Sequence, residues 1–289
     1  MRRCLLVLLL VAVPPLFGQS DPISRAWNAP VEPFRIVGNL YYVGAADIAS
    51  YLIATSKGHI LIDGGFVETV PHIRANLEKL GFDIHDVKIL LNTHAHYDHA
   101  GGLAALQKLT GALVMASEAD TRHLEAGGVI DPQFGDRFSF PPVKVDRRLL
   151  DGDRITVGAS MITARLTPGH TPGATTWVAR IRWAGRSYDV VIVSSVSVPS
   201  GYQLTNNAKY PNVIEDYRRS FRLLRSLPCD IFLGPHGSFF DLTRKRKLLG
   251  KKPAENPFVD PAGWKRYLDA SERRFEDVVL TQSRSDRPR

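Results

Sequence analysis

The segment "LLNTHAHYDHAGG", residues 90–102, places three histidines and one aspartate within the six positions from His94 to His99. The chain of 289 residues has only nine histidines, so a chance cluster in a polar loop explains the pattern poorly. Imidazole nitrogens and a carboxylate oxygen are ligands of borderline metals such as zinc. The segment therefore predicts a metal site, and a fold that brings several ligands to one point.

This cluster follows an expected strand and precedes an expected helix. Residues 87–91, "VKILL", are apolar and stop at Asn-Thr, which predicts a buried strand, and "AGGLAALQKL" predicts a helix that ends at Gly111. If the chain stays extended beyond the strand, positions 94, 96 and 98 point to one side, and His99 joins them only if the backbone turns. Four ligand-type side chains exceed the three that a catalytic zinc usually takes, so the segment suggests two metals.

The remaining pattern predicts strands and helices in two successive groups. A helix is expected over residues 70–80, with Thr69 as its N-cap and Gly81 as its stop. "VKILL", the helix after it and "ALVMAS" form a β-α-β unit, and residues 121–145 are less regular. Further strands are expected in "FRIVGNLYYVG", "ASYLIAT", "HILIDGG", "DRITVG", "MITARLT", "TTWVARIRW", "YDVVIVSSV" and "DIFLGPHG". Further helices are expected in "PNVIEDYRRSFRLLRSL" and in "DPAGWKRYLDASERRFEDVVL", which Asp260 caps.

This order of elements predicts an α+β fold in which two mixed sheets lie between helices, a four-layer αβ/βα sandwich. No linker or repeat divides it clearly, so residues 21–289 are expected to form a single domain, with a disordered tail after about residue 281. Residues 1–20 stand apart. The basic "MRRC", the short apolar "LLVLLLVAV" and the small residues near Ser20 predict a cleaved secretory signal peptide.

Composition excludes some classes of protein. The formal net charge of +8 becomes +6 when Arg2 and Arg3 leave with the signal peptide, and no basic groove with interleaved aromatic residues supports nucleic-acid binding. The densest basic run, "RKRKLLGKK" at 244–252, is expected to be a solvated helix face or loop, or less readily a surface that attracts anions. The mature chain keeps one cysteine, Cys229, which is expected to be a buried core thiol.

Two further histidines occupy similar positions. His170 lies in "LTPGHTPG", a turn between two expected strands, and His236 lies in "FLGPHG", also at a strand end. Loops at strand ends are where α/β folds gather functional residues on a rigid scaffold. Together with the first cluster they make six candidate ligands, which are His94, His96, Asp98, His99, His170 and His236.

In this order and spacing, "THAHYDHAGG", "PGHTPG" and "GPHG" resemble the metallo-β-lactamase superfamily, whose Thr-His-x-His-x-Asp-His motif is highly specific. The likeness covers about residues 34 to 240. "LIDGG" resembles an early strand end of the superfamily, which implies that Asp63 lies near the metals without binding them. The resemblance implies two zinc sites, one formed by His94, His96 and His170 and the other by Asp98, His99 and His236.

The residues after "YDVVIV" narrow the choice within the superfamily. Glyoxalase II and lactonases bridge their metals with an aspartate in this region, and the first subclass of β-lactamases has a zinc-binding cysteine there. This chain has Ser194, Ser195 and Ser197 instead. These serines, the histidine in the first ligand position and the run "PSGYQL…YPNVIEDYRRSF" resemble the third subclass (B-three). That resemblance implies that Ser195 and Ser197 bind the carboxylate of the substrate.

The implied activity is that of a zinc-dependent β-lactamase with two Zn²⁺ per chain. It would hydrolyse the β-lactam amide of penicillins, cephalosporins and carbapenems with a metal-bound hydroxide and confer antibiotic resistance. The residues expected to be catalytic are Asp98, His94, His96 and His170. We expect a monomer in the periplasm that binds a small-molecule β-lactam, with no nucleic-acid partner and no membrane contact after the signal peptide is cleaved.

Several alternatives remain open at this stage. The nearest is another dinuclear-zinc hydrolase of the superfamily, a lactonase or a thioesterase. A mononuclear iron persulfide dioxygenase and a secreted metal-binding protein without catalysis are further candidates. The role of the aromatic residues in the 121–145 segment is also open, because Phe134, Phe138 and Phe140 suit either a loop over the cleft or a surface subcore.

Overall fold

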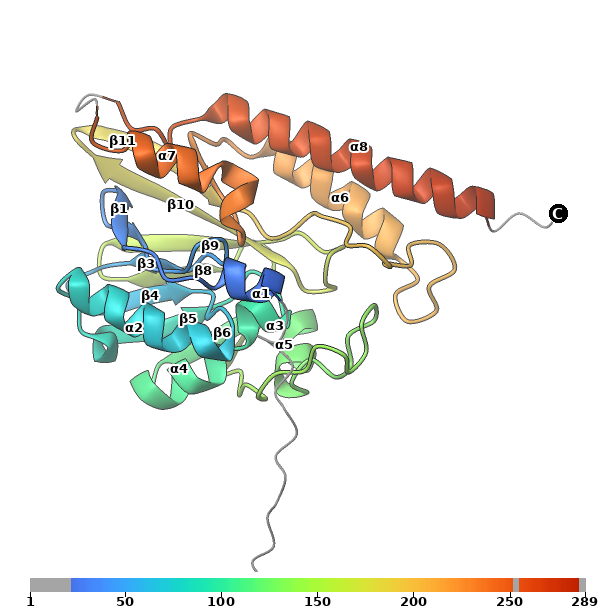
Figure 1. Cartoon of the computed structure of the whole chain (residues 1–289), viewed down its shortest axis with the longest axis horizontal. Coiled ribbons are helices and arrows are strands. Elements are labelled where there is room, and N and C mark those ends of the chain that lie inside the picture. Colours follow the sequence, from blue (N-terminus) through green and yellow to red (C-terminus); the bar gives the residue numbers. More distant parts are fainter. Residues whose placement is uncertain (1–21, 252–254, 286–289) are drawn as a thin grey trace, which may run out of the picture.

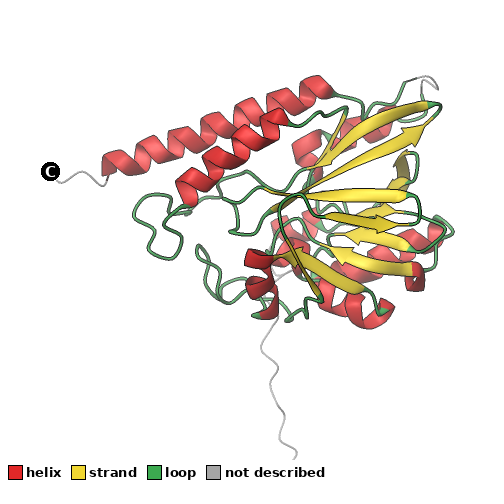
Figure 2. Cartoon of the chain, turned by 180° about the vertical axis from the view of Figure 1, so that it is seen from behind, coloured by secondary structure: helices red, strands yellow, loops and turns green. Residues whose placement is uncertain are grey.

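The structure, a computed structural model, describes residues 22–251 and 255–285. Two β-sheets lie face to face, and helices cover the outer side of each sheet (Figures 1 and 2). The predicted four-layer sandwich is therefore confirmed. The predicted signal peptide, residues 1–20, lies outside the described residues.

The first sheet has seven strands in the order β1-β2-β3-β4-β5-β6-β7. Antiparallel pairing joins the first four strands as the predicted hairpins, and β4 to β7 then run parallel, so the β-α-β prediction is also confirmed. The last strand, β7, was not predicted. The bounds are β1 Phe34–Val37, β2 Leu40–Tyr42, β3 Tyr51–Ile53, β4 His59–Ile62, β5 Val87–Leu91, β6 Leu113–Ser117 and β7 Arg147–Leu149.

The second sheet has five strands in the order β12-β11-β10-β9-β8. Along β10, Trp177, Ala179 and Ile181 are buried between the sheets, whereas Arg180 and Arg182 are exposed, as the two-residue period of a strand requires. The bounds are β8 Arg154–Val157, β9 Ser160–Leu166, β10 Thr175–Trp183, β11 Arg186–Ile192 and β12 Ile231–Leu233.

Helices α2 Val70–Lys79 and α4 Leu103–Thr110 cover the first sheet, and their apolar side chains join one buried cluster with β4, β5 and β6. The end of α4 is as predicted, because Gly111 adopts the left-handed conformation, with φ of 66°. Helix α2 begins where predicted, with Thr69 at the N-cap position, but the capping bond expected of this residue is not formed. Its hydroxyl instead donates to Asn28 Oδ1 at 2.7 Å.

Helices α6 Val213–Ser226, α7 Leu242–Leu248 and α8 Pro261–Ser285 cover the second sheet (Figure 1). The predicted apolar face of α6 is buried, and Tyr217 stacks on Phe275 of α8 with ring centroids 4.8 Å apart. Asp260 accepts the Gly263 N–H at 2.8 Å, which confirms the predicted cap of α8. In the described part of the chain, no helix is both long and apolar enough to span a membrane.

Three predictions about irregular or exposed segments need correction. The 121–145 segment begins inside helix α5 Glu118–Glu125, because Ser117 caps this helix and one of its faces is buried. Lys245, in the run predicted to be a solvated face, is 1 % exposed and pairs with Asp260 at 3.1 Å. The predicted disorder after about residue 281 is also wrong for 282–285, which continue α8, and residues 286–289 lie outside the described part.

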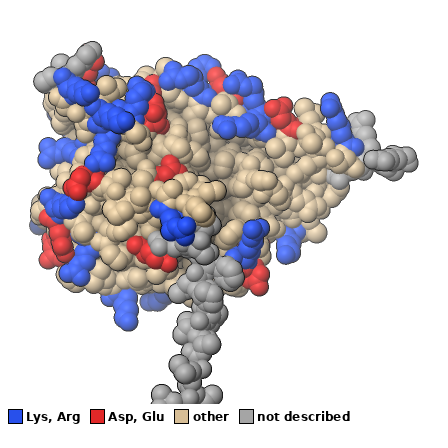
Figure 3. All heavy atoms as spheres, in the orientation of Figure 1, with Lys and Arg blue, Asp and Glu red and all other residues tan. Residues whose placement is uncertain are grey.

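The short helices connect these layers. They are α1 Pro22–Trp27, α3 Tyr97–Ala100 and the 3₁₀ helices η1 Val67–Thr69, η2 Ile84–Asp86 and η3 Gly237–Phe240. On the face shown in Figure 3, acidic and basic side chains are interspersed along the periphery, and the centre carries few charges.

Parallel pairing brings several strand ends to the same edge. Ile62 pairs with Leu91 at the ends of β4 and β5, and Ile192 pairs with Leu233 at the ends of β11 and β12. The loops that leave these four strands carry Asp63, the His94–His99 cluster, the serines and His236. The two-layer sheet arrangement thus gathers them across the junction between the sheets.

Candidate metal centre

Six side chains converge at this edge from three loops. His94 and His96 lie between β5 and α3, Asp98 and His99 lie in α3, His170 lies between β9 and β10, and His236 follows β12. The "AGG" that follows the cluster lets α3 pack closely against the end of β4, because a Cβ on Gly102 would lie 2.2 Å from Gly64 O. The chain turns at Tyr97, which brings His99 to the same side as Asp98.

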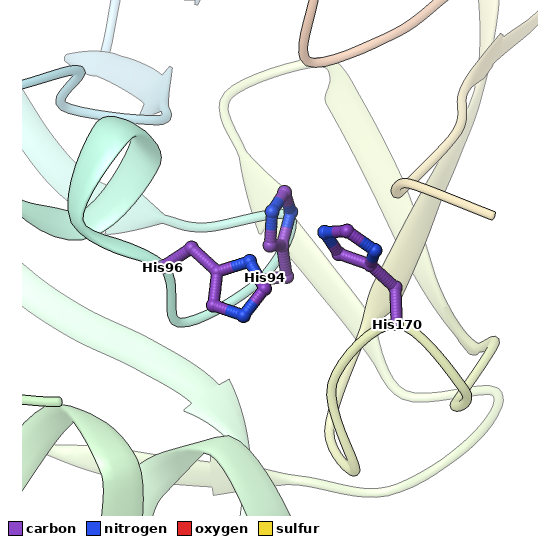
Figure 4. Close-up of side chains that lie close together, drawn as sticks. All are labelled: His94, His96 and His170. Carbon is purple, nitrogen blue, oxygen red and sulfur yellow. The ribbon is translucent and has the colours of Figure 1, made fainter. Parts of the chain in front are cut away.

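The first group of donors consists of His94, His96 and His170, whose rings point toward one another (Figure 4). All three are buried, and one nitrogen from each ring lies within 4.8 Å of the others. Their ring centroids are 4.7 to 4.9 Å apart. This is a compact set of three nitrogen donors that share one small space.

The second group consists of Asp98, His99 and His236. Asp98 Oδ2 lies 3.3 Å from His99 Nε2 and 3.5 Å from His236 Nε2, and the two ring nitrogens are 3.3 Å apart. A tetrahedral zinc with bonds of about 2.0 to 2.1 Å requires neighbouring ligand atoms about 3.3 to 3.4 Å apart. The donor atoms of the second group therefore match one face of a zinc tetrahedron.

Four of the five histidines have a hydrogen-bond partner on the ring nitrogen that faces away from their group, whereas His99 Nδ1 has none among the described residues and only approaches the Asp63 carboxylate. These contacts are His94 Nδ1 with Thr93 Oγ1 at 3.1 Å, His170 Nδ1 with Ser197 O at 2.9 Å, His236 Nδ1 with Asp47 Oδ2 at 2.9 Å, His96 Nε2 with Asp131 Oδ2 at 3.2 Å and His99 Nδ1 with Asp63 Oδ2 at 3.7 Å. Such contacts fix the orientation of metal-binding histidines and select the nitrogen left to bind. His96 therefore offers Nδ1, and the other four histidines offer Nε2.

Ionisation of these groups also suits metal binding. Burial, followed by the charges of neighbouring histidines, lowers the pKa of His94 and of His170 well below the usual range, so both rings are neutral donors. Burial opposes ionisation of Asp98, but the adjacent His99 outweighs it and holds the pKa of Asp98 below its usual range. The arrangement thus supplies neutral imidazoles at His94 and His170 and an ionised carboxylate at Asp98, which are the forms that bind metals. Burial opposes protonation of His99, but Asp98 and Asp63 outweigh it and raise the pKa of this ring, so His99 must release a proton to bind a metal.

Asp63 supports the loop of the first group. It has a φ of 62°, and its two carboxylate oxygens accept the Thr93 N–H at 2.6 Å and the Thr93 hydroxyl at 2.8 Å. Together with its 3.7 Å approach to His99 Nδ1, this position is that of a carboxylate behind the donors. The structure thus places Asp63 beside the donors, and its not binding the metals stays a prediction.

Sequence reasoning missed Asp120, which joins the two loops that carry the first group. Asp120 is 1 % exposed; its Oδ2 accepts the Ala95 N–H at 2.9 Å and the Thr171 hydroxyl at 3.2 Å, and its Oδ1 accepts the Gly173 N–H at 2.9 Å. A lone aspartate in "ASEADTRH" carries no local signal for this role, because its partners lie 25 to 53 residues away.

A cleft of about 500 Å³ opens over both donor groups. Trp27, Tyr97, Phe134, Phe138 and Phe239 supply aromatic walls, and Asp47, Asp98, Arg137 and several serines supply polar ones. A larger hollow of about 800 Å³ borders it and shares Ser197, Ser238 and Phe239 with it, but it contains none of the candidate ligands.

The three phenylalanines of the 121–145 segment lie in two different environments. Phe134 and Phe138 line the cleft, and Phe138 stacks on Tyr97 with centroids 4.7 Å apart and planes 9° from parallel. Phe140 instead lies in the buried cluster under α4. The segment is therefore partly a wall of the cleft and partly an extension of the core.

Both predicted serines reach the cleft. Ser195 Oγ and Ser197 Oγ are 2.9 Å apart, and the Ser197 N–H donates to Ser195 Oγ at 3.3 Å. Ser195 is 2 % exposed, whereas Ser197 is partly exposed. Ser197 also has a role that the sequence did not indicate, because its carbonyl oxygen orients His170 and accepts the Tyr217 hydroxyl at 2.7 Å.

Two solved β-lactamase structures match this chain over nearly their whole length, whereas a curated relative matches it only over part of its length. The FEZ-1 metallo-beta-lactamase from Legionella gormanii superposes with a TM-score of 0.87 at 44% identity, over 89% of this chain and 98% of that one. The class B3 di-zinc metallo-beta-lactamase LRA-12 from an Alaskan soil metagenome gives 0.82 and 35%, over 89% and 97%. A hydroxyacylglutathione hydrolase from Rhodospirillum rubrum is 31% identical over 113 residues, which are 39% of this chain but only 35% of that protein.

A family comparison points in the same direction. The family described as the Metallo-beta-lactamase superfamily matches residues 43–182, which include the first five candidate ligands along the chain. The similarity to FEZ-1 covers almost all of that enzyme at an identity well above the level that shows the fold alone. This chain therefore belongs to the metallo-beta-lactamase superfamily.

Proposed function

We propose that the protein is an exported zinc-dependent β-lactamase that takes two zinc ions per chain and confers resistance to β-lactam antibiotics. The observation that carries the proposal is the pair of adjoining donor groups on the floor of one open cleft. The similarity to two β-lactamases over nearly their full length supports it. We further propose that residues 21–289 act as a single-domain monomer.

The residues that would hold zinc follow from the two groups of donors. His94 Nε2, His96 Nδ1 and His170 Nε2 would hold one ion, and Asp98 Oδ2, His99 Nε2 and His236 Nε2 would hold the other. When bound, the pair of ions supplies Lewis acidity for an amide carbonyl and makes water a nucleophile near neutral pH. No side-chain nucleophile is then needed.

Asp98 has a second task in this proposal. Its Oδ2 belongs to the second donor group, which leaves Oδ1 to accept a hydrogen bond from the attacking water in the cleft. A carboxylate in this position orients the water toward the carbonyl carbon and can hold its proton. Asp98 would therefore act in catalysis as well as in metal binding.

The two serines would recognise the carboxylate beside the lactam nitrogen. Within the pair one hydroxyl hydrogen is used internally, because Ser195 Oγ and Ser197 Oγ bond to each other. Since Ser197 is the more exposed residue, its hydroxyl is the one available to donate to a substrate, and Ser195 holds it in place. The aromatic walls would cover the apolar parts of the substrate and exclude water.

Thioester hydrolysis is the second candidate, because hydroxyacylglutathione hydrolases match part of the chain. Two observations favour the β-lactamase. The match spans only about a quarter to a third of those proteins, and serines occupy the loop after β11, where relatives of the glyoxalase II type bridge their metals with an aspartate.

The test compares substrates and variants. Protein purified from residue 21 with excess zinc should bind two zinc ions and hydrolyse a penicillin, a cephalosporin or a carbapenem, and a chelator should abolish this activity. His170→Ala and Asp98→Ala should each reduce zinc content and lower kcat/KM by orders of magnitude, because metal ligands act as a unit. His59→Ala is the matched control, because this buried histidine begins β4 at the end opposite to Asp63.

Two outcomes would overturn the proposal. Turnover of S-lactoylglutathione with no β-lactam hydrolysis would assign the protein to the second candidate. One zinc per chain at saturation would contradict the dinuclear centre. Export has a separate test, since mass spectrometry of the protein secreted by a bacterial host should give a mature N-terminus near residue 21, and an intact Met1 would refute it.

A further inference from the structure

The charged side chains that line the cleft differ in whether they have a protein partner. Asp47 accepts both the His236 ring and the Ser238 N–H, and Asp98 belongs to a donor group. Arg137 is the one lysine or arginine among the described residues that line this cleft. Its guanidinium lies over the Phe138 ring, 5.0 Å from the centroid, and within the described chain no carboxylate lies within ion-pair distance of it.

Hydrogen bonds and a ring contact fix the loop that carries Arg137. Asp131 Oδ1 accepts the Gln133 and Phe134 N–H groups, and Asp131 Oδ2 contacts His96 Nε2. Gln133 and Gln203 exchange two hydrogen bonds across the cleft wall, and Phe138 stacks on Tyr97. Arg137 is thus an exposed cation held at the rim by a fixed aromatic surface.

The side chains of Phe134, Arg137 and Phe138 form the wall of the cleft that would face one end of the proposed substrate. The ring of Phe134 lies 5.5 Å from that of His96, beside the donor group that would face the lactam carbonyl. The serines, on the loop after β11, would bind the ring carboxylate. The acyl side chain leaves a β-lactam from the carbon next to the carbonyl, away from the ring carboxylate, and so toward Phe134, Arg137 and Phe138.

We propose that Arg137 forms an anion subsite at the rim of the cleft and that the enzyme favours β-lactams whose acyl side chain bears a second carboxylate. This inference rests on the proposed β-lactamase function. A guanidinium pairs with a carboxylate through two parallel hydrogen bonds, which an ammonium cannot reproduce. The aromatic wall would receive the apolar part of the same side chain.

Two penicillins provide a matched test. Benzylpenicillin and carbenicillin differ only by a carboxylate on the carbon next to the side-chain amide. Arg137→Gln should lower kcat/KM for carbenicillin by about three- to tenfold, mainly through KM, and change that for benzylpenicillin by less than about twofold. Arg137→Lys should recover only part of the loss. The effect should shrink as salt is raised, because an exposed ion pair is screened.

Arg186→Gln is the matched control. Arg186 also lies over an aromatic ring, that of Tyr188 at 4.9 Å, but it begins β11, at the end of that strand opposite the serines. The control removes the same charge and should leave the ratio of the two penicillins unchanged. An unchanged ratio in Arg137→Gln would overturn the inference, and so would an equal loss for both substrates. If the wild type hydrolyses no β-lactam of any class, the proposed function itself fails, which is a distinguishable result. Hydrolysis of other β-lactams but of neither penicillin would overturn the inference alone.

Discussion

Gln282, near the end of α8, holds the loop that runs past the candidate metal centre through three hydrogen bonds. Its Nε2 donates to Tyr202 O at 2.6 Å, and its Oε1 accepts the Leu204 and Thr205 N–H groups at 2.7 and 3.2 Å. The Tyr202 ring stacks on that of His170 with centroids 5.6 Å apart, and its hydroxyl donates to His170 O at 3.1 Å. Gln282→Ala should therefore loosen a loop that holds one of the candidate ligands.

The size of the effect follows from the bonds lost. Three hydrogen bonds at about 0.5 to 1.5 kcal/mol each give an upper range of about 1.5 to 4.5 kcal/mol. Gln282 is partly exposed, so water will replace some of them, and we expect a loss of about 1.5 to 3 kcal/mol. For a domain of this size, that corresponds to a fall in Tm of roughly 3 to 10 °C.

The assay separates a local effect on the centre from general destabilisation. Unfolding in urea gives the loss of stability, and competition with a chelator gives the zinc affinity. Gln107→Ala is the control, because Gln107 also bridges a loop, through Lys144 O at 2.9 Å and Asp146 Oδ2 at 3.0 Å, but without a contact to the centre. Gln282→Ala should lose zinc more readily than Gln107→Ala; equal zinc retention by both variants would refute the reasoning.

Three further predictions concern single residues. Asp120→Asn replaces one acceptor oxygen by a donor that faces an N–H or O–H group, so the zinc-free protein should lose about 1 to 3 kcal/mol of stability in urea. Ser197→Ala should raise KM for a penicillin more than Ser195→Ala does, with kcat nearly unchanged; the reverse order would contradict the assignment of the free hydroxyl. Burial raises the pKa of Cys229 to about 12, so a thiol reagent at pH 8 should label the native protein far more slowly than the urea-unfolded protein, and equal rates would refute this.

The sequence by itself determined the layers of the fold and the six candidate ligands. Apolar runs with strand or helix periods and glycines such as Gly111 are local signals, and they predicted most strands and the main helices. The ligand-type residues could be recognised because they follow strand ends, where a sheet gathers loops. The departures occurred where a local pattern was weak, as at β7, or where a distant partner took the side chain, as Asn28 takes the hydroxyl of the N-cap residue Thr69.

Only the tertiary structure decided how the centre is held. The contacts of His170, His96 and His236 that select their free nitrogens come from residues 27, 35 and 189 positions away along the chain. Asp120, Gln282 and the buried Lys245 likewise acquire their roles from partners on other elements. No local pattern encodes such pairs, because a hydrogen-bond partner is chosen by distance in the folded chain, and that distance is set by how the two sheets and their helices pack.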